Sequence, residues 1–120
     1  MTRASLIALA LLITPAFAGD TITLHARPGG YALHHVRVAD VWLRQGKRVV
    51  IAGDQASAAA IQVIYYAGRG GSICAMRGVL LYLHEGRSRG AVTNANRRYL
   101  GRTLATGWYA PEKFGIGECT

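Results

Sequence analysis

Three short segments of this 120-residue sequence carry residue types that could do chemistry, and each follows an apolar stretch typical of a strand. They are RPGG at 27–30, the serine of GDQAS at 53–57, and the histidine of LHE at 83–85. A serine hydroxyl becomes an effective nucleophile when a histidine accepts its proton, and preorganised backbone N–H groups stabilise the oxyanion that forms. The set therefore predicts acyl transfer, with Ser57 as the nucleophile and His84 as the general base.

Small residues next to these segments could supply the oxyanion hole. Gly29 and Gly30 follow Pro28 and carry no side chain, so their backbone N–H groups can turn towards a bound anion. Ala58 follows the serine at the expected start of a helix, where N–H groups lack helical partners and the helix dipole favours negative charge. We therefore expect Gly29, Gly30 and Ala58 to surround the reacting oxygen.

Each of these features also has a purely structural interpretation. Serine is a common N-cap residue, so Ser57 could only begin a helix. A lone histidine such as His84 could only complete a hydrogen bond at the end of a strand. Proline followed by glycines, as at 28–30, is typical of a tight turn. The chemical interpretation gains weight because all three features occur together, in the order that the chemistry needs.

Alternating strand and helix patterns must position these residues. Apolar and β-branched runs predict strands at 21–26, 48–53 and 79–85, and helical spacing of apolar residues predicts helices at 31–45, 57–68 and 91–105. Strands that alternate with helices at these lengths predict an α/β fold in which βαβ units form one parallel sheet. Since such sheets place ligand chemistry at the carboxyl ends of their strands, we expect the three segments to converge at one edge.

The first eighteen residues have the features of a secretory signal peptide. Arg3 precedes the unbroken apolar run LIALALLI at 6–13, and Ala16-Phe17-Ala18 forms an A-x-A cleavage site. Eight apolar residues are too few to span a bilayer, although an uncleaved membrane anchor is the alternative. We expect a signal peptide at 1–18 and a single α/β domain at 19–120 in a periplasmic or secreted protein, with no transmembrane anchor after cleavage.

Cysteine content and charge narrow the choice of partners. Cys74 and Cys119 are the two cysteines, and an isolated pair in an oxidising compartment predicts a disulfide. Without Arg3, 13 basic residues stand against 6 acidic ones, a net charge of +7. This surplus favours anionic partners in general, but the charges are scattered, so no specific nucleic-acid partner is expected.

Neither a metal ion nor another cofactor is expected. His25, His34 and His35 lack the spacing of a zinc site, because adjacent residues diverge on a helix. The sequence also has no H-x-x-x-H or C-x-x-C motif.

The stretch from ARPGG to LHEG, residues 26–86, resembles the proteolytic subunit of Clp proteases and, more loosely, secreted and periplasmic relatives within the crotonase-like superfold. RPGG is similar to that family's Ser-Pro-Gly-Gly turn, which implies that the Gly30 N–H group is an oxyanion donor. GDQASA is similar to the segment around the family's nucleophile, which implies Ser57 and the Ala58 N–H group. MRGVLLYLHE is similar to the strand that ends in the family's catalytic histidine, which implies His84.

The sequence departs from this family where the third member of a catalytic triad should lie. No aspartate follows His84, and the later acidic residues are Glu85, Glu112 and Glu118. Glu85 should point to the opposite face of a continuing strand, whereas Glu118 lies in an ending that faintly resembles the family's own. Glu118 is therefore the candidate acid. The expected mature chain starts almost at the first matched strand, and the segment that stacks Clp subunits into rings is also missing. The resemblance therefore implies neither ring assembly nor ATP-dependent unfolding.

Two functions from different classes remain open. The first is a small secreted or periplasmic serine hydrolase that acts on peptides or proteins through Ser57 and His84, with or without Glu118. The second is a pseudoenzyme, in which a truncated fold of the Clp-protease and crotonase type serves as a binding or assembly module. A homo-oligomer is compatible with either function.

Overall fold

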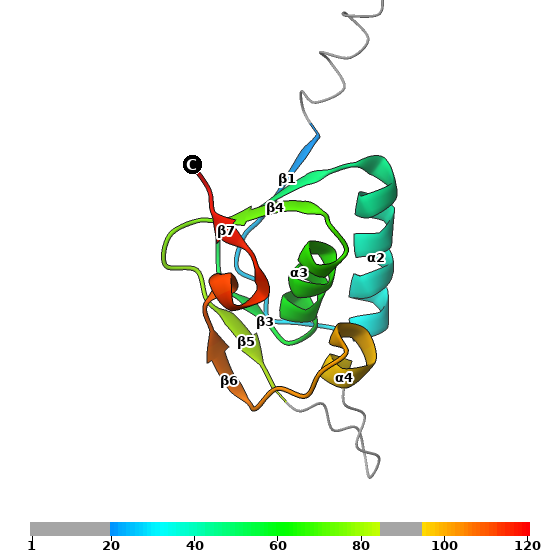
Figure 1. Cartoon of the computed structure of the whole chain (residues 1–120), viewed down its shortest axis with the longest axis vertical. Coiled ribbons are helices and arrows are strands. Elements are labelled where there is room, and N and C mark those ends of the chain that lie inside the picture. The colour runs from blue at the N-terminus through cyan, green and yellow to red at the C-terminus, as the bar shows by residue number, and fades with distance from the viewer. Residues whose placement is uncertain (1–19, 85–94) are drawn as a thin grey trace, which may run out of the picture.

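The computed structural model describes residues 20–84 and 95–120, and the predicted signal peptide at 1–18 lies outside these ranges (Figure 1). The α/β class predicted from the sequence is confirmed. In chain order the elements are β1 (Thr21–Leu24), α2 (Ala32–Gln45), β2 (Arg48–Ile51), β3 (Gln55–Ala56), α3 (Ala58–Gly68), β4 (Ser72–Ala75), β5 (Leu81–Leu83), α4 (Ala95–Leu100), β6 (Gly107–Tyr109), the 3-10 helix η1 (Pro111–Phe114) and β7 (Gly117–Glu118).

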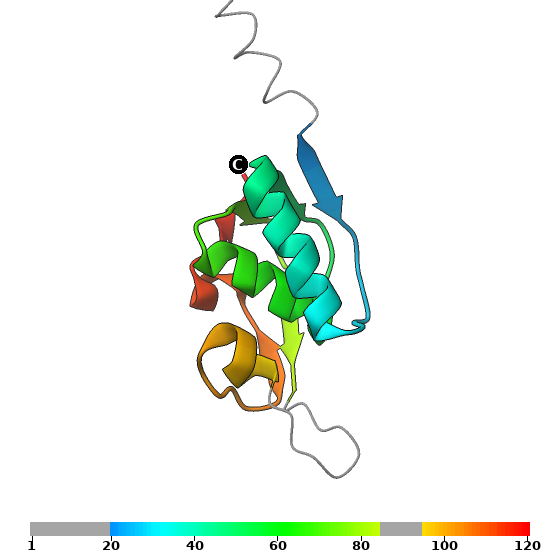
Figure 2. The same ribbon diagram turned by 90° about the vertical axis from the view of Figure 1, so that its right-hand side faces the viewer.

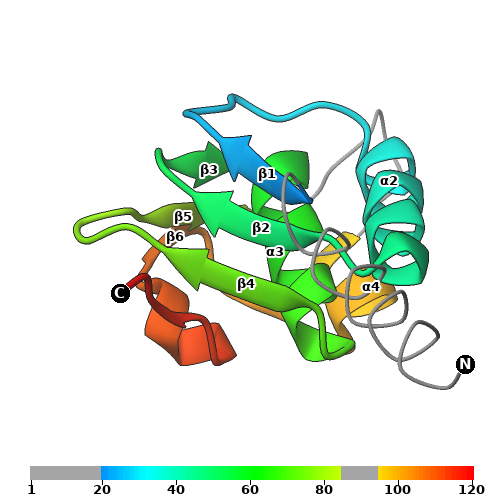
Figure 3. The ribbon, with the colours of Figure 1, turned by 90° about the horizontal axis from the view of Figure 1, so that it is seen from above.

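The larger sheet is parallel and has the strand order β1-β2-β4-β7. Figure 3 shows β1, β2 and β4 side by side above α3. Val49 and Ile51 of β2 are fully buried, as expected for a β-branched strand in the middle of a covered sheet. α2 forms the crossover from β1 to β2, which is the βαβ unit that the sequence predicts.

The strands do not form one sheet, and the prediction is wrong on this point. β3 and β5 pair in parallel, and β5 pairs with β6 antiparallel, to make a second sheet of three strands. The chain leaves the first sheet after β2 because it turns at Gly53, where an added Cβ would lie 2.5 Å from the Ala26 nitrogen. The expected third strand at 79–85 is also shorter, since β5 covers only Leu81–Leu83.

Helix α3 occupies the centre of the domain, with α2 on one side, β5 on the other and β4 above it (Figure 1). Figure 2 shows α2 crossing in front of it. Its first nine residues, from Ala58 to Tyr66, are all buried, so this helix has no polar face. Three consecutive alanines at its start allow the surrounding backbone to approach closely. The helix that begins directly after Ser57 is therefore held by tertiary packing on every side.

The last predicted helix is much shorter than expected. Of the range 91–105, α4 covers only Ala95–Leu100, while 91–94 lie outside the described residues. Gly101 ends the helix because its φ of +74° is a left-handed conformation, which glycine adopts readily after the last helical turn.

The Cys74–Cys119 disulfide is present, as the sequence predicts, with an S–S distance of 2.04 Å. It reinforces the pairing of β4 with β7, in which Cys74 lies opposite Gly117. The bond thereby fastens the C-terminal strand to the edge of the larger sheet.

Replacing Cys74 by serine should lower the free energy of unfolding by about 4 kcal/mol, the chain-entropy value for a loop of this length. Urea unfolding of the oxidised wild type and of Cys74→Ser measures the difference. A loss below about 1 kcal/mol would show that the disulfide adds little to the β4–β7 pairing.

The buried side chain of Gln55 joins the ends of three strands. Its Nε2 atom donates to the carbonyl oxygens of His25 and Gly53, both at 2.8 Å, and its Oε1 atom accepts from Arg27 Nε at 2.6 Å. The backbone adds a bridge between Arg27 and Gln55, with Arg27 N bonded to Asp54 O and Ala56 N bonded to Arg27 O. Gln55 therefore holds the segment that leads into Gly29 and Gly30 beside the segment that leads into Ser57.

We expect Gln55→Leu to lower the free energy of unfolding by roughly 2–4 kcal/mol, because it leaves two carbonyl groups and the partly buried Arg27 without their partner. Gln45→Leu, at the exposed end of α2, is the matched control and should change stability by less than about 0.5 kcal/mol. Equal effects of the two changes would contradict this role for Gln55.

Candidate active site

Ser57 and His84 lie in direct contact, with 2.7 Å between Ser57 Oγ and His84 Nε2. The parallel pairing of β3 with β5 produces this contact. Ala56 lies opposite Tyr82, so Ser57 is one residue beyond the pair and His84 two residues beyond it at the same end of the ladder. The Ser57 N–H group donates to Tyr82 O at 2.7 Å, which extends the register of the β3–β5 pairing as far as Ser57.

The Ser57 backbone has a strained conformation, with φ of 59° and ψ of −122°. Within the described ranges it is the only non-glycine residue with a positive φ. Its hydroxyl makes no N-cap hydrogen bond to α3, so the structural interpretation of Ser57 as a simple cap does not hold. A sharp strand-to-helix turn that presents the serine Oγ outward is the geometry of a nucleophile elbow.

The two glycines of RPGG make close contacts, Gly29 with the Ser57 turn and Gly30 with the His35 ring. A Cβ atom added to Gly29 would lie 3.0 Å from Ser57 Cβ, and one added to Gly30 would lie 2.7 Å from His35 Cε1. Both glycines also have positive φ angles, of 130° and 147°. Glycine is therefore required here for close approach and for backbone conformation together.

A cavity of about 150 Å³ opens beside the serine, and of the three residues expected to form the oxyanion hole, Gly30 and Ala58 line it but Gly29 does not. Ser57 and His84 border it together with Gly30 and Ala58. The N–H groups of Gly30 and Ala58 donate to no other protein atom in the part of the chain that the structure describes.

Asn96 is a residue of this site that the sequence analysis did not identify. It lines the same cavity from the first turn of α4 and is fully buried. Its Nδ2 atom donates to His84 O at 3.4 Å, while its Oδ1 atom has no hydrogen-bond partner among residues 20–84 and 95–120. A buried acceptor without a partner is costly, so this oxygen is a candidate contact for a ligand donor.

The ring of Tyr82 lies next to that of His84, and the ring of Trp108 lies next to that of Tyr82. The Tyr82 ring centroid lies 6.1 Å from that of His84 and 5.1 Å from that of Trp108 on the neighbouring strand β6. Trp108 is 54% exposed, which is unusual for so large an apolar side chain. Alternation along β5 could have indicated the outward face, but the pairing with β6 was not predicted.

Glu118 does not join the Ser57–His84 pair. Its Oε1 atom accepts from Arg77 Nε at 3.0 Å, beside the β4–β7 pairing. β7 and the carboxyl end of β5 lie towards opposite ends of the domain in both views (Figures 1 and 2). Glu85, the other acid weighed for this position, lies outside the described residues.

The described residues contain no group of three histidine, cysteine, aspartate or glutamate side chains arranged to hold a metal ion. Within the same ranges, no helix combines the length and apolarity that crossing a bilayer requires. No protein-family profile, curated protein or solved structure matches this chain. The interpretation of the site therefore depends on its own geometry.

Replacing Ser57 by glycine should give a more stable protein than replacing it by alanine, by about 1–2 kcal/mol. Both changes remove the bond to His84, but only glycine relieves the strain of the positive φ. Thermal or urea unfolding of the two variants measures the difference. Equal stability would mean that the backbone at position 57 is not strained.

Proposed function

We propose that this protein is a small serine hydrolase that acts on peptides or proteins outside the cytoplasm. The observation that carries the proposal is the 2.7 Å contact between His84 Nε2 and Ser57 Oγ. The backbone of this serine is strained, and its hydroxyl does not cap α3. The signal-peptide pattern at 1–18 and the disulfide support an extracytoplasmic location. The resemblance to the Clp-protease and crotonase-like group also supports the proposal, because the serine and histidine motifs occur in the same order along the chain as in that group.

In the proposed reaction, His84 Nε2 accepts the Ser57 proton as Oγ attacks the substrate carbonyl carbon. The N–H groups of Gly30 and Ala58 stabilise the negative charge that develops on the carbonyl oxygen. The histidinium ion then donates its proton to the leaving amine as the carbon–nitrogen bond breaks. Water, deprotonated by His84, releases the acyl group from Ser57 and restores the serine.

The cavity favours a small apolar acyl group. Its volume of about 150 Å³ has room for a side chain of only a few carbon atoms. Ala32, Ile61 and Leu83 contribute apolar atoms to its wall. Asn96 Oδ1 could accept a hydrogen bond from a substrate N–H group, a donor that peptides have and simple esters lack. A peptide with a small apolar residue before the cleaved bond fits both features.

Glu118 is paired with Arg77, so this proposal assigns no third residue to orient His84. A serine and a histidine that act without an acid would be slow, because removing the acid from a complete triad lowers turnover by about four orders of magnitude. A pseudoenzyme that uses the same surface for binding is the second candidate, and the separation of Glu118 from the pair favours it.

Labelling with a fluorophosphonate distinguishes the two functions. We expect the oxidised wild-type protein to form an adduct, Ser57→Ala to abolish it, and His84→Ala to slow its formation by at least about a hundredfold. Ser72→Ala, at an exposed serine of β4, is the matched control and should label normally.

Glu118→Gln should label within about twofold of the wild type, because Glu118 does not contact His84. Slowing as severe as that of His84→Ala would instead show that a complete triad forms. Absence of any wild-type adduct, with the fold intact by circular dichroism, would favour the pseudoenzyme.

A further inference from the structure

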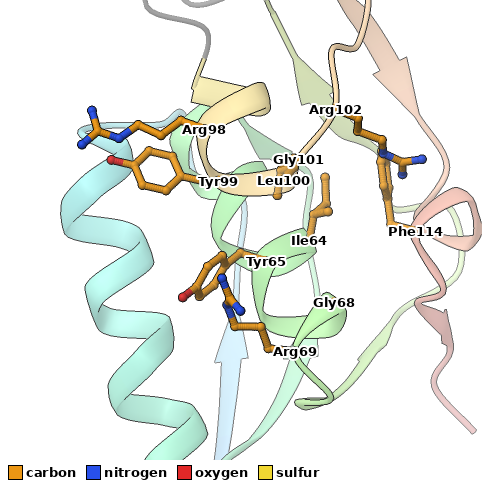
Figure 4. Close-up of a pocket in the computed structure, with 10 residues that line it drawn as sticks. All are labelled: Ile64, Tyr65, Gly68, Arg69, Arg98, Tyr99, Leu100, Gly101, Arg102 and Phe114. Carbon is orange, nitrogen blue, oxygen red and sulfur yellow. The ribbon is translucent and has the colours of Figure 1, made fainter.

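A second hollow, which we call the arginine groove, lies between the second half of α3, the end of α4 and η1 (Figure 4). Its volume is about 480 Å³, within the range of sites for small organic molecules. It shares no lining residue with the cavity beside Ser57. A ligand confined to this groove would therefore contact none of the residues that line that cavity.

Charge in the arginine groove is of one sign. Arg69, Arg98 and Arg102 line it, and no aspartate or glutamate does. The ion pairs found in the described ranges, Lys47–Asp20 and Arg77–Glu118, involve none of these arginines. Three guanidinium groups around one hollow, without carboxylate partners in the described part of the chain, form a site of positive potential.

Each of the three arginines lies over an aromatic ring, and the Arg98 guanidinium is 5.5 Å from the Tyr99 ring centroid. The Arg69 guanidinium lies 4.3 Å from the Tyr65 ring centroid, and that of Arg102 lies 5.0 Å from the Phe114 centroid. The Tyr65 hydroxyl donates to Asp40 at 2.7 Å, which restrains the ring beneath Arg69. Stacking orders a guanidinium group while leaving its in-plane N–H groups free for an anion.

The floor between these stacked pairs is apolar. Figure 4 shows Ile64 and Leu100 between the Arg69–Tyr65 pair on one side and the Arg102–Phe114 pair on the other. Gly68 and Gly101 also line the groove, and a Cβ atom added to either would meet no atom within 4 Å. The absence of side chains at these two positions leaves room for a ligand.

We propose that the arginine groove binds a small amphipathic anion, an organic molecule with an apolar body and a carboxylate, sulfonate or phosphate group. The apolar body would cover Ile64 and Leu100, and the anionic group would accept hydrogen bonds from Arg69 or Arg102. A neutral apolar ligand would desolvate the guanidinium groups without pairing them. Inorganic phosphate would leave the apolar floor uncovered.

A matched pair of fluorescent dyes tests this proposal on the oxidised, full-length mature protein. Anilinonaphthalene sulfonate and phenylnaphthylamine share the same aromatic body, and only the first carries a negative charge. We expect the sulfonate to bind at least about tenfold more tightly. Octyl phosphate should displace it, whereas inorganic phosphate and octyl glucoside should not at the same concentration.

Variants locate the site. Arg69→Gln and Arg102→Gln should each weaken sulfonate binding by about fivefold or more, and Arg69→Lys should weaken it less because the charge remains. Arg37→Gln, at an exposed position of α2, removes the same charge and should change binding by less than twofold. Near-ultraviolet circular dichroism confirms that each variant has folded.

Three results would overturn the proposal. Equal affinity for the two dyes would mean that the groove binds apolar molecules without selecting for negative charge. Equal weakening by Arg37→Gln would mean attraction to the overall charge of the protein. Failure of octyl phosphate to displace the dye, together with Arg69-dependent binding to anionic phosphatidylglycerol vesicles, would assign the groove to a membrane surface. None of these results depends on whether Ser57 is catalytic.

Discussion

The arrangement of the candidate site depends on one buried carboxamide. Gln55 is fully buried, and its side chain satisfies carbonyl groups from the ends of β1 and β2 while accepting a hydrogen bond from Arg27. These polar backbone ends would otherwise be desolvated without partners, at a cost of a few kcal/mol. Because Gln55 is only two residues before Ser57, satisfying them also brings the RPGG segment to the serine. Burial of Arg27 lowers the pKa of its guanidinium, which nevertheless remains protonated at physiological pH.

A strained serine can persist at position 57 because its neighbours leave it little freedom. On one side, Gln55 and Ala56 are paired with β5, and on the other, Ala58 starts a helix whose first nine residues are buried. Gly29 lies against the serine Cβ atom. A conformation that costs 1–3 kcal/mol is therefore imposed by a well-packed surrounding structure, which is the usual circumstance of strain at functional sites.

Residue patterns predicted the positions of helices and strands better than they predicted which strands pair with one another. α2 and α3 begin one residue later than expected, at Ala32 and Ala58, and end where expected. The apolar residues of α2 recur at helical spacing, whereas α3 is a nearly continuous apolar run that ends at a glycine. β3 and β7 have two residues each, too few to show any alternation. Periodicity also describes a strand without saying which sheet it joins, so the division into two sheets was not foreseen.

The candidate site was predicted in the same uneven way. Ser57, His84 and the glycines were identifiable because their chemistry is recognisable from residue type and order. Asn96 was not, because asparagine has many structural uses and only the tertiary fold brings it to the cavity. Glu118 was chosen because the ending that contains it faintly resembles that of the Clp-protease family, but the β4–β7 pairing places it beside Arg77. Long-range pairings of this kind leave no mark in local sequence.

The disulfide constrains one half of the candidate site, and whether it forms depends on the redox state of the surrounding compartment. The covalent loop from Cys74 to Cys119 encloses His84 and Asn96, whereas Ser57 and the glycines of RPGG precede it in the chain. The half of the site that holds the base is thus tethered at both of its ends only when the cysteines are oxidised. In a reducing compartment the same half is held by strand pairing and packing without the covalent link, so the chain is most firmly assembled where thiols are oxidised.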